Sequence, residues 1–332
     1  VIAGLSLLSS GYFNAKAQEN YHSKYNTSIH TLVNKVHKEN IFITPKILDR
    51  AIDLSKKIIT KQNYPEQEAK NLMKKLDSLI FKQNSNLNDE YINYNKSLIY
   101  LAIAEENNLP LYPVLMPGYV VLRWDPDGKH KVFKPKDPVN QGDFNWDPSN
   151  LETVEDDAFL SYLFHHKVMS FEKLAKGVYL KNLDKHELLA VAYWQEALVL
   201  KKLCRYGDAI EYANKSIKTN PDYPKAYQIR GECLTNLGSL LRKKEFHESA
   251  IEDYKKSQEL YFDSDNYYAM GFNLYRLERY DEAEKYYNEA LDIFPDEQKY
   301  LAGRYLLYTK TNQEEKAKRD STKLKFLLKE ED

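Results

Sequence analysis

The stretch "RLERYDEAEKYYNEALDIFPDE", residues 276–297, is the clearest indication of how the C-terminal half of this chain folds. Aromatic and small residues alternate in it at helical spacing, and a proline follows. Small residues let two helices cross closely, and aromatic rings fill the remaining gaps. Proline ends a helix because it lacks an N–H group and clashes with the preceding turn. The residues of the pattern are Tyr280, Ala283, Tyr287, Ala290 and Pro295. The stretch therefore predicts the second helix of an antiparallel pair.

The same pattern recurs along the C-terminal half at a nearly constant period. Its marker residues are Ala209, Ala250, Ala283 and Ala317, which lie 41, 33 and 34 residues apart. The longest interval corresponds to one period plus an insertion of seven residues near "SLLRKKE". A fixed period of this length indicates a solenoid of stacked helical pairs. We predict three regular repeats and a degenerate fourth that caps the stack.

The pattern resembles the tetratricopeptide repeat, which implies an all-α solenoid over residues 190–330. The resemblance also implies that positions 2, 5, 9, 12 and 13 of the first helix of each repeat face a groove. In the first repeat these include Trp194, Leu198, Lys201 and Lys202, after Val191. In the second they are Lys225, Gln228, Glu232, Thr235 and Asn236. In the third they include Tyr268, Phe272, Tyr275 and Arg276, after Asp265.

This predicted groove is aromatic and basic, which suits an extended or helical peptide with apolar anchors. The repeat type that clamps a C-terminal carboxylate uses Lys and Asn at set positions, and here Trp194 and Leu198 replace two polar members. An alternative stays open for two of the aromatics. Trp194 and Phe272 are expected either in the groove or buried by the preceding helix or by the N-terminal domain.

The N-terminal half reads as a small α+β domain. Helical patterns occupy residues 41–110, whereas 18–40 and 83–90 read as loops or weak structure. Strands are expected at Val120–Trp124 and Lys131–Phe133, around the turn "DPDG" at 125–128. The turn-rich stretch 134–150 follows. The sequence therefore predicts helices first and then a hairpin or short antiparallel sheet.

Two further motifs resemble the transglutaminase-like branch of the papain-type fold. They are "LIYLAIAEENNLPLYPVLMPGYVVLRW", residues 98–124, and "FNWDPSN", residues 144–150. The resemblance implies a cysteine nucleophile, a histidine base and a residue that orients the histidine. Those positions fall at Asn93, at Tyr119, and at Asn145 or Asp147. A phenol with a pKa of about 10 is a poor base at neutral pH, and an asparagine is no nucleophile. The resemblance therefore implies a degenerate domain, a pseudoenzyme without catalytic residues.

The remaining serine, histidine and cysteine residues give only weak indications of a catalytic or metal site. A Ser97–His130 pair could serve a cysteine-independent hydrolase or acyl transferase, which is the alternative function. His165 and His166 lack the i, i+4 spacing of a helical metal pair. Cys204 and Cys233 are too few for a disulfide scaffold and are expected as buried residues within helices. We predict no metal and no cofactor.

The first residues look like the end of a secretion signal. An apolar run, Val1 to Leu8, precedes the small-x-small site Ala15-Lys16-Ala17, so the mature chain is expected to begin at Gln18. This predicts an exported bacterial protein, periplasmic or extracellular, without an integral membrane segment in the mature chain. The expected divisions are 1–17 signal peptide, 18–40 linker, 41–155 degenerate transglutaminase-like domain, 156–189 linking helices and 190–330 repeats.

Charge and composition limit the class of binding partner. The 332 residues carry a formal net charge of −1, from 48 basic and 49 acidic side chains. Such a balance argues against a broad nucleic-acid surface or a polybasic membrane surface. Aromatic residues make up 13% of the chain, more than disordered chains contain. We therefore expect a folded, non-catalytic interaction or scaffold protein that binds a protein or peptide partner through the repeat groove.

Overall fold

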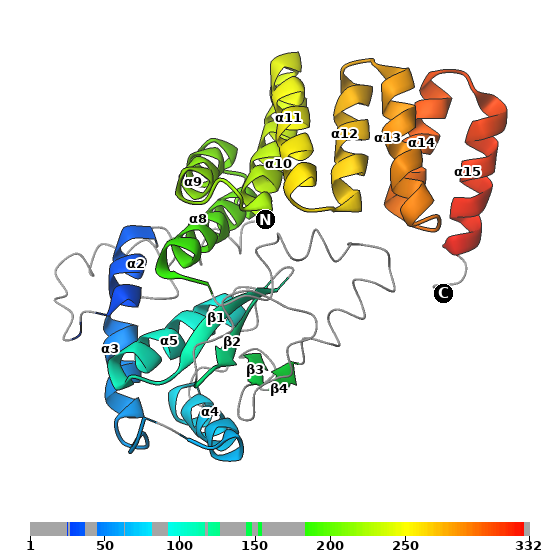
Figure 1. The fold of residues 1–332 in the computed structure, drawn as a ribbon. Coiled ribbons are helices and arrows are strands. Elements are labelled where there is room, and N and C mark those ends of the chain that lie inside the picture. Colours follow the sequence, from blue (N-terminus) through cyan, green and yellow to red (C-terminus); the bar gives the residue numbers. More distant parts are fainter. Residues whose placement is uncertain are drawn as a thin grey trace, which may run out of the picture. The chain divides into compact units, whose positions relative to one another are not determined.

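The computed structural model describes residues 25, 27–36, 45–62, 64–81, 92–116, 119–126, 144–147, 152–154 and 183–328 (Figure 1). The chain divides into two compact units, and the boundary falls inside one helix, between Ala192 and Tyr193. Each unit is described by itself. Among the described residues, no helix is both long enough and apolar enough to cross a membrane.

The N-terminal unit combines helices with an antiparallel sheet. Its helices are α2 (Ser28–Val36), α3 (Pro45–Ser55), α4 (Glu66–Phe81) and α5 (Ile92–Asn107). Its strands are β1 (Leu111–Met116), β2 (Tyr119–Trp124), β3 (Phe144–Asp147) and β4 (Glu152–Val154). The strands pair in chain order, β1-β2-β3-β4, and every pairing is antiparallel. The described part of this unit is therefore α+β, with the helices first in the chain.

Helix α5 is the centre of this unit. All seven residues of "LIYLAIA", 98–104, are buried, and a helix that is apolar all round must be enclosed on every side. The helix contacts α2 and α3 as well as β1 and β2. Trp124 on β2 is fully buried and meets the ring of Tyr64 edge-on, with ring centroids 6.2 Å apart. Trp124 is therefore a core aromatic of this unit.

Part of the expected linker is a helix. Residues 28–36 form α2, in which Ile29, Leu32 and Val33 are buried at helical spacing. The backbone N–H of His30 donates to Thr27 Oγ1 at 3.2 Å, as in an N-cap. His30 Nε2 lies 3.0 Å from Asp49 Oδ1 on α3. The prediction of weak structure over 18–40 was therefore wrong for α2, because polar Asn, Lys and Ser residues masked a short apolar face.

The structure shows a hairpin that the sequence did not predict. It joins β1 to β2 with the register Leu111↔Trp124 to Met116↔Tyr119. The hairpin predicted around "DPDG" cannot be compared with it, because the second half of that turn lies outside the described residues. The expected strand Lys131–Phe133 lies outside the described residues. Residues 144–147, expected within a turn-rich stretch, pair with β2 as β3. The strand 111–116 was missed because Pro113 interrupts an otherwise apolar run.

The C-terminal unit is a row of antiparallel helical pairs, as the repeat pattern predicts (Figure 1). The first helices of the pairs are α8 (Lys185–Lys202), α10 (Pro224–Leu241), α12 (Ser264–Arg276) and α14 (Gln298–Lys310). The second helices are α9 (Tyr206–Thr219), α11 (Lys244–Leu260), α13 (Tyr280–Ile293) and α15 (Glu314–Leu327). The first helix begins at Lys185, five residues before the predicted domain start, and its first residues belong to the N-terminal unit.

Glycine and tyrosine make the close crossings within the pairs. A Cβ added at Gly231 would lie 3.1 Å from the ring of Tyr254, and one at Gly271 would lie 2.9 Å from the ring of Tyr287. Both tyrosines are buried at helix positions facing these glycines. The missing Cβ thus lets an aromatic ring lie flat on the neighbouring helix backbone, which is the packing that the sequence pattern predicts.

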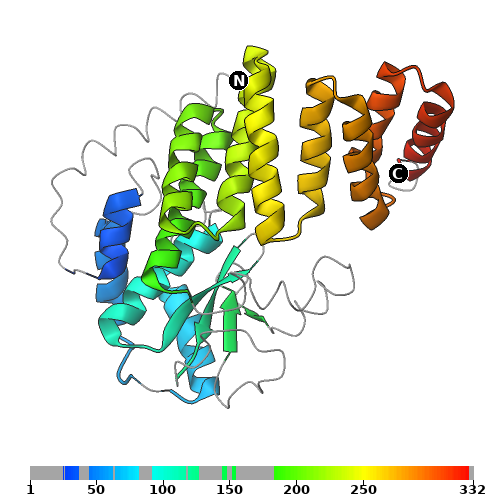
Figure 2. The same cartoon turned by 45° about the horizontal axis from the view of Figure 1, so that its top comes forward.

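The seven-residue insertion lengthens two helices instead of forming a loop. Helices α10 and α11 have 18 and 17 residues, against 13 and 14 in α12 and α13. Figure 2 shows the tip of this longer pair reaching beyond that of α12 and α13. In the added turn, a Cβ placed on Gly238 would lie 2.9 Å from the ring of His247. This contact repeats the one between Gly231 and Tyr254 seven residues away, so the insertion is one additional layer of the same helix packing.

Each pair turns through a residue in the left-handed region. These residues are Cys204, Arg242, Glu278 and Asn312, with φ between 55° and 64°. Cys204 is consequently exposed in the α8–α9 turn, so the prediction of a buried helical cysteine was wrong for this residue. Cys233 is buried as predicted, and burial raises the pKa of its thiol to about 12. The helical period alone does not show where a helix end places a residue in solvent.

Candidate peptide-binding surface

The first helices of the four pairs present positions 2, 5, 9, 12 and 13 of each repeat, and we name this surface the A-helix face. Its predicted members differ in exposure. Trp194 is only 7% exposed and meets the ring of Tyr223 edge-on, with centroids 5.9 Å apart. Leu198 and Lys201 are half-buried, and Lys202 is exposed. Of the two alternatives for Trp194, the structure shows the buried one, so this residue offers little surface to a partner.

Tyr268 links the third repeat to the fourth. Its ring stacks on that of Tyr300 at a centroid distance of 5.6 Å and lies 5.9 Å from that of Tyr287. A Cβ added at Gly303 would lie 2.9 Å from the Tyr268 ring. Burial raises the pKa of the Tyr268 phenol, which therefore stays neutral at physiological pH. Through these contacts Tyr268 holds the third and fourth repeats together.

The other predicted members of the third repeat are more accessible. Phe272 and Tyr275 are half-buried, and Arg276 is exposed. Tyr275 packs on Tyr280 of the second helix, with ring centroids 5.9 Å apart. Phe272 makes no ring contact with another described aromatic residue. Phe272 and Arg276 are therefore the members of this repeat with the most surface available to a partner.

Most charges on the A-helix face are already paired within the solenoid. Lys201 Nζ lies 2.5 Å from Glu232 Oε2, which joins the first repeat to the second. Two more such pairs join the later repeats: Lys225 Nζ–Asp263 Oδ2 at 3.0 Å and Lys299 Nζ–Asp265 Oδ1 at 2.6 Å. These pairs hold the register between neighbouring first helices, so their charges are partly neutralised before any partner arrives.

The fourth repeat also contributes to this face, which was not predicted from the sequence. Leu306, at position 9 of α14, is 55% exposed, and Lys310, at position 13, is exposed as well. They lie 34 residues after Phe272 and Arg276. Adding one period to those two residues would have found them. Leu306 and Lys310 were not predicted because the fourth repeat was expected to be a degenerate cap.

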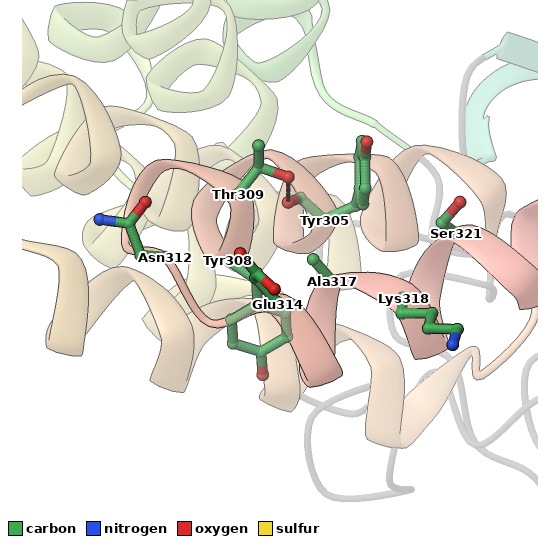
Figure 3. A pocket seen from close by; sticks show the side chains of 8 residues that line it. All are labelled: Tyr305, Tyr308, Thr309, Asn312, Glu314, Ala317, Lys318 and Ser321. Carbon is green, nitrogen blue, oxygen red and sulfur yellow. Dashed lines mark hydrogen bonds between the residues drawn. The ribbon is translucent and has the colours of Figure 1, made fainter.

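A pocket of about 390 Å³ opens between α14 and α15 (Figure 3). Its lining residues are Tyr305, Tyr308, Thr309, Asn312, Glu314, Ala317, Lys318 and Ser321. Tyr305 and Ser321 come from the two facing helices of the pair. In the third repeat the corresponding positions hold Gly271 and Tyr287, so here the large and small residues have changed places.

Family comparisons agree with the repeat geometry. Family models described as tetratricopeptide repeat match residues 190–223 and residues 231–296. The C-terminal region consists of tetratricopeptide repeats. The fourth pair, α14–α15, continues the stack beyond the matched residues. No curated protein matches the chain at a significant level.

Several solved structures are similar to part of this chain. MamA residues 41 to the end from Desulfovibrio magneticus RS-1 is 20% identical, covers 43% of this chain and 77% of its own, and has a TM-score of 0.38. YrrB, described as "a TPR protein with an unusual peptide-binding site", is 16% identical, with 42% and 68% covered and a TM-score of 0.36. TTC0263 from Thermus thermophilus is 18% identical, with 42% and 81% covered and a TM-score of 0.36.

The positions predicted from the transglutaminase-like resemblance fall on elements of the N-terminal unit. Asn93 lies in the first turn of α5 and Tyr119 begins β2. Asn145 and Asp147 lie on β3, where Asn145 pairs with Arg123 of β2. The side chains of these four residues lie outside the described part. Ser97 is buried within α5, whereas its suggested partner His130 and the His165–His166 pair lie outside the described residues.

Proposed function

We propose that this protein binds a protein or peptide partner on the A-helix face of its tetratricopeptide repeats. One observation carries the proposal: Phe272 and Leu306 leave apolar surface at the same position of neighbouring repeats, each with an exposed cation one turn away. Partly exposed apolar anchors with adjacent charges are typical of binding hot spots. The buried Trp194 and the stacked Tyr268 serve the solenoid, and the remaining predicted members, Leu198 to Lys202 and Phe272 to Arg276, serve the partner.

The experiment separates binding from folding. The full chain would capture its partner from the cells that produce it, and the identified partner would then be titrated calorimetrically. Phe272→Ala should keep the melting temperature within a few degrees and weaken binding by roughly 1–3 kcal/mol. Tyr268→Ala is the contrast, since it removes an inter-repeat stack and should lower the melting temperature. If Phe272→Ala binds as tightly as the parent chain, the A-helix face is not the binding surface.

We also propose that the N-terminal unit is a degenerate transglutaminase-like domain without catalytic activity. The enclosed helix α5, the following hairpin and strand β3 support it, as do the motifs at 98–124 and 144–150. The alternative is a cysteine-independent hydrolase or acyl transferase of the same fold. Release of ammonia from glutaminyl peptides by the purified chain would contradict the proposal, whereas an inert protein at high concentration would agree with it.

Export is a separate proposal. The apolar start of the chain and Ala15-Lys16-Ala17 support cleavage after Ala17 and a location in the bacterial envelope. Mass spectrometry of the protein expressed from its full gene should find a mature chain that begins at Gln18. A chain that retains Val1 in the cytoplasmic fraction would contradict this proposal.

A further inference from the structure

Three of the four repeats carry the same pair of residues on the A-helix face. Each pair is an apolar residue at position 9 and a cation at position 13: Leu198 and Lys202, Phe272 and Arg276, and Leu306 and Lys310. Residues four apart lie on one face of a helix, one turn from each other. The row therefore offers a partner alternating apolar and positive steps along the stack.

The cations in this row face solvent. Lys202, Arg276 and Lys310 are all exposed. Among the described residues, Arg276 and Lys310 make no ion pair, in contrast to Lys201, Lys225 and Lys299 at neighbouring positions of the same face. A cation in the last turn of a helix also favours the helix dipole. The dipole does not require an apolar residue one turn earlier, so it explains only half of each pair.

We propose that the partner segment is acidic and extended, with carboxylates on the position-13 cations and apolar side chains at position 9. This inference rests on the proposed function, since it names the chemistry of the partner that the A-helix face binds. Packed helices lie about 8–10 Å apart. An extended chain in the polyproline II conformation rises about 3.1 Å per residue and has three residues per turn, so every third side chain lies on the same side. One repeat therefore corresponds to roughly three residues, and the acidic residues of the partner recur at about every third position.

The second repeat interrupts the row. It holds Glu232 at position 9 and Asn236 at position 13, and Lys201 already pairs with Glu232. Asn236 is exposed, so a longer charged side chain fits there without repacking. The third and fourth repeats are thus the main site, and Asn236→Lys should extend it. A gain in binding is a stricter test than a loss, because misfolding cannot produce it.

The experiment measures fluorescence anisotropy of two dye-labelled, acetylated nonapeptides with the full chain. One peptide repeats glutamate, leucine and glycine three times, and the other has glutamine in place of glutamate. The acidic peptide should bind more tightly than its glutamine counterpart, with an affinity that falls as salt is added. Arg276→Glu and Lys310→Glu should each weaken it by roughly tenfold, and Asn236→Lys should strengthen it by up to about fivefold. The matched control is Arg319→Glu, an exposed charge on α15 that should change nothing.

Melting curves on the same preparations show that each variant is folded, and Arg276→Gln serves if the reversal perturbs the solenoid. Equal binding of the two peptides, unaffected by Arg276→Glu, would overturn the acidic partner but leave the proposed function standing. Failure of both peptides to bind would also overturn the proposal of an acidic partner. The proposed function fails separately, through an unchanged affinity of Phe272→Ala for the captured partner.

Discussion

The third and fourth helical pairs carry a large and a small residue at corresponding positions, but in opposite order. In α12–α13 the first helix provides Gly271 and the second provides Tyr287, whose ring lies on the glycine backbone. In α14–α15 the first helix provides Tyr305 and the second provides Ser321. Tyr305 and Ser321 both line the pocket of about 390 Å³ between these two helices.

The difference indicates that a helical pair depends on the combined volume of two corresponding side chains and not on the residue type at one position. Close packing constrains the sum of two facing side chains, so either helix can supply the ring. A sequence pattern that expects a small residue in the first helix therefore reads the fourth pair as degenerate. The structure shows it as a regular pair with the two sizes reversed.

The largest expected effect comes from breaking the crossing in the third pair. Gly271→Leu places a side chain where even a Cβ would lie 2.9 Å from the Tyr287 ring, so we expect a loss of roughly 3 kcal/mol or more. Chemical denaturation of the full chain measures it. The matched control is Gly207→Leu, because no atom of the described residues lies within 4 Å of a Cβ at that exposed glycine. Equal stability of the two variants would disprove the close-crossing explanation.

A second prediction concerns an arginine–aspartate contact that the second and fourth pairs share. Arg304 donates from Nε and Nη2 to the two oxygens of Asp320, at 2.9 and 2.7 Å, and from Nη1 to Asn288 at 2.7 Å. Arg230 makes the same three contacts with Asp253 and Asn214 in the second pair.

Arg304→Ala leaves the carboxylate of Asp320 buried without its cation and should cost about 2 kcal/mol. Arg304→Ala with Asp320→Asn should regain part of that loss, because the stranded charge is gone. Urea denaturation of the single and double variants checks this. A double variant less stable than the single one would show that packing, and not charge, is what Arg304 contributes.

The exchange itself can be tested by a double-mutant cycle. Ser321→Tyr alone places a second tyrosine beside Tyr305 in the lining of the pocket and should cost about 1–3 kcal/mol if the two rings compete for the same space. Adding Tyr305→Gly recreates the arrangement of the third pair and should recover about 1 kcal/mol or more as coupling energy. Additive losses would mean that the two positions do not share one space.

The smallest expected effect is a pH dependence at the junction of the third and fourth pairs. Burial opposes ionisation of Glu284, but hydrogen bonds from Lys316 Nζ at 2.8 Å and Tyr308 Oη at 2.9 Å hold the pKa of its carboxyl below the usual value. A lowered folded-state pKa means that the stabilisation is present above about pH 4.3 and is lost as pH falls through the folded value. Glu284→Gln should therefore flatten the acid limb of a melting-temperature profile. An unchanged limb would exclude Glu284 as its source.

Local patterns were sufficient where the chain repeats itself. The Ala and Tyr spacing predicted the helical pairs, and the interval between Ala209 and Ala250 predicted the insertion. The candidate surface was predictable only in part, because exposure depends on neighbours. Trp194 and Tyr268 occupy predicted surface positions, yet Tyr223 covers one and Tyr300 stacks on the other. In the N-terminal unit, α2 was not predicted because its segment is rich in polar residues. Strand β1 was not predicted because Pro113 interrupts its apolar run.

The period and the helical pairing could be predicted from the amino-acid sequence, because each depends on spacing along the chain. The partner that covers each side chain could be found only from the folded structure. It placed Lys201 against Glu232, left Arg276 in solvent and turned Cys204 outward at a left-handed helix end. Helix periodicity fixes the direction of a side chain, whereas its burial depends on residues one repeat away, which the local pattern does not contain.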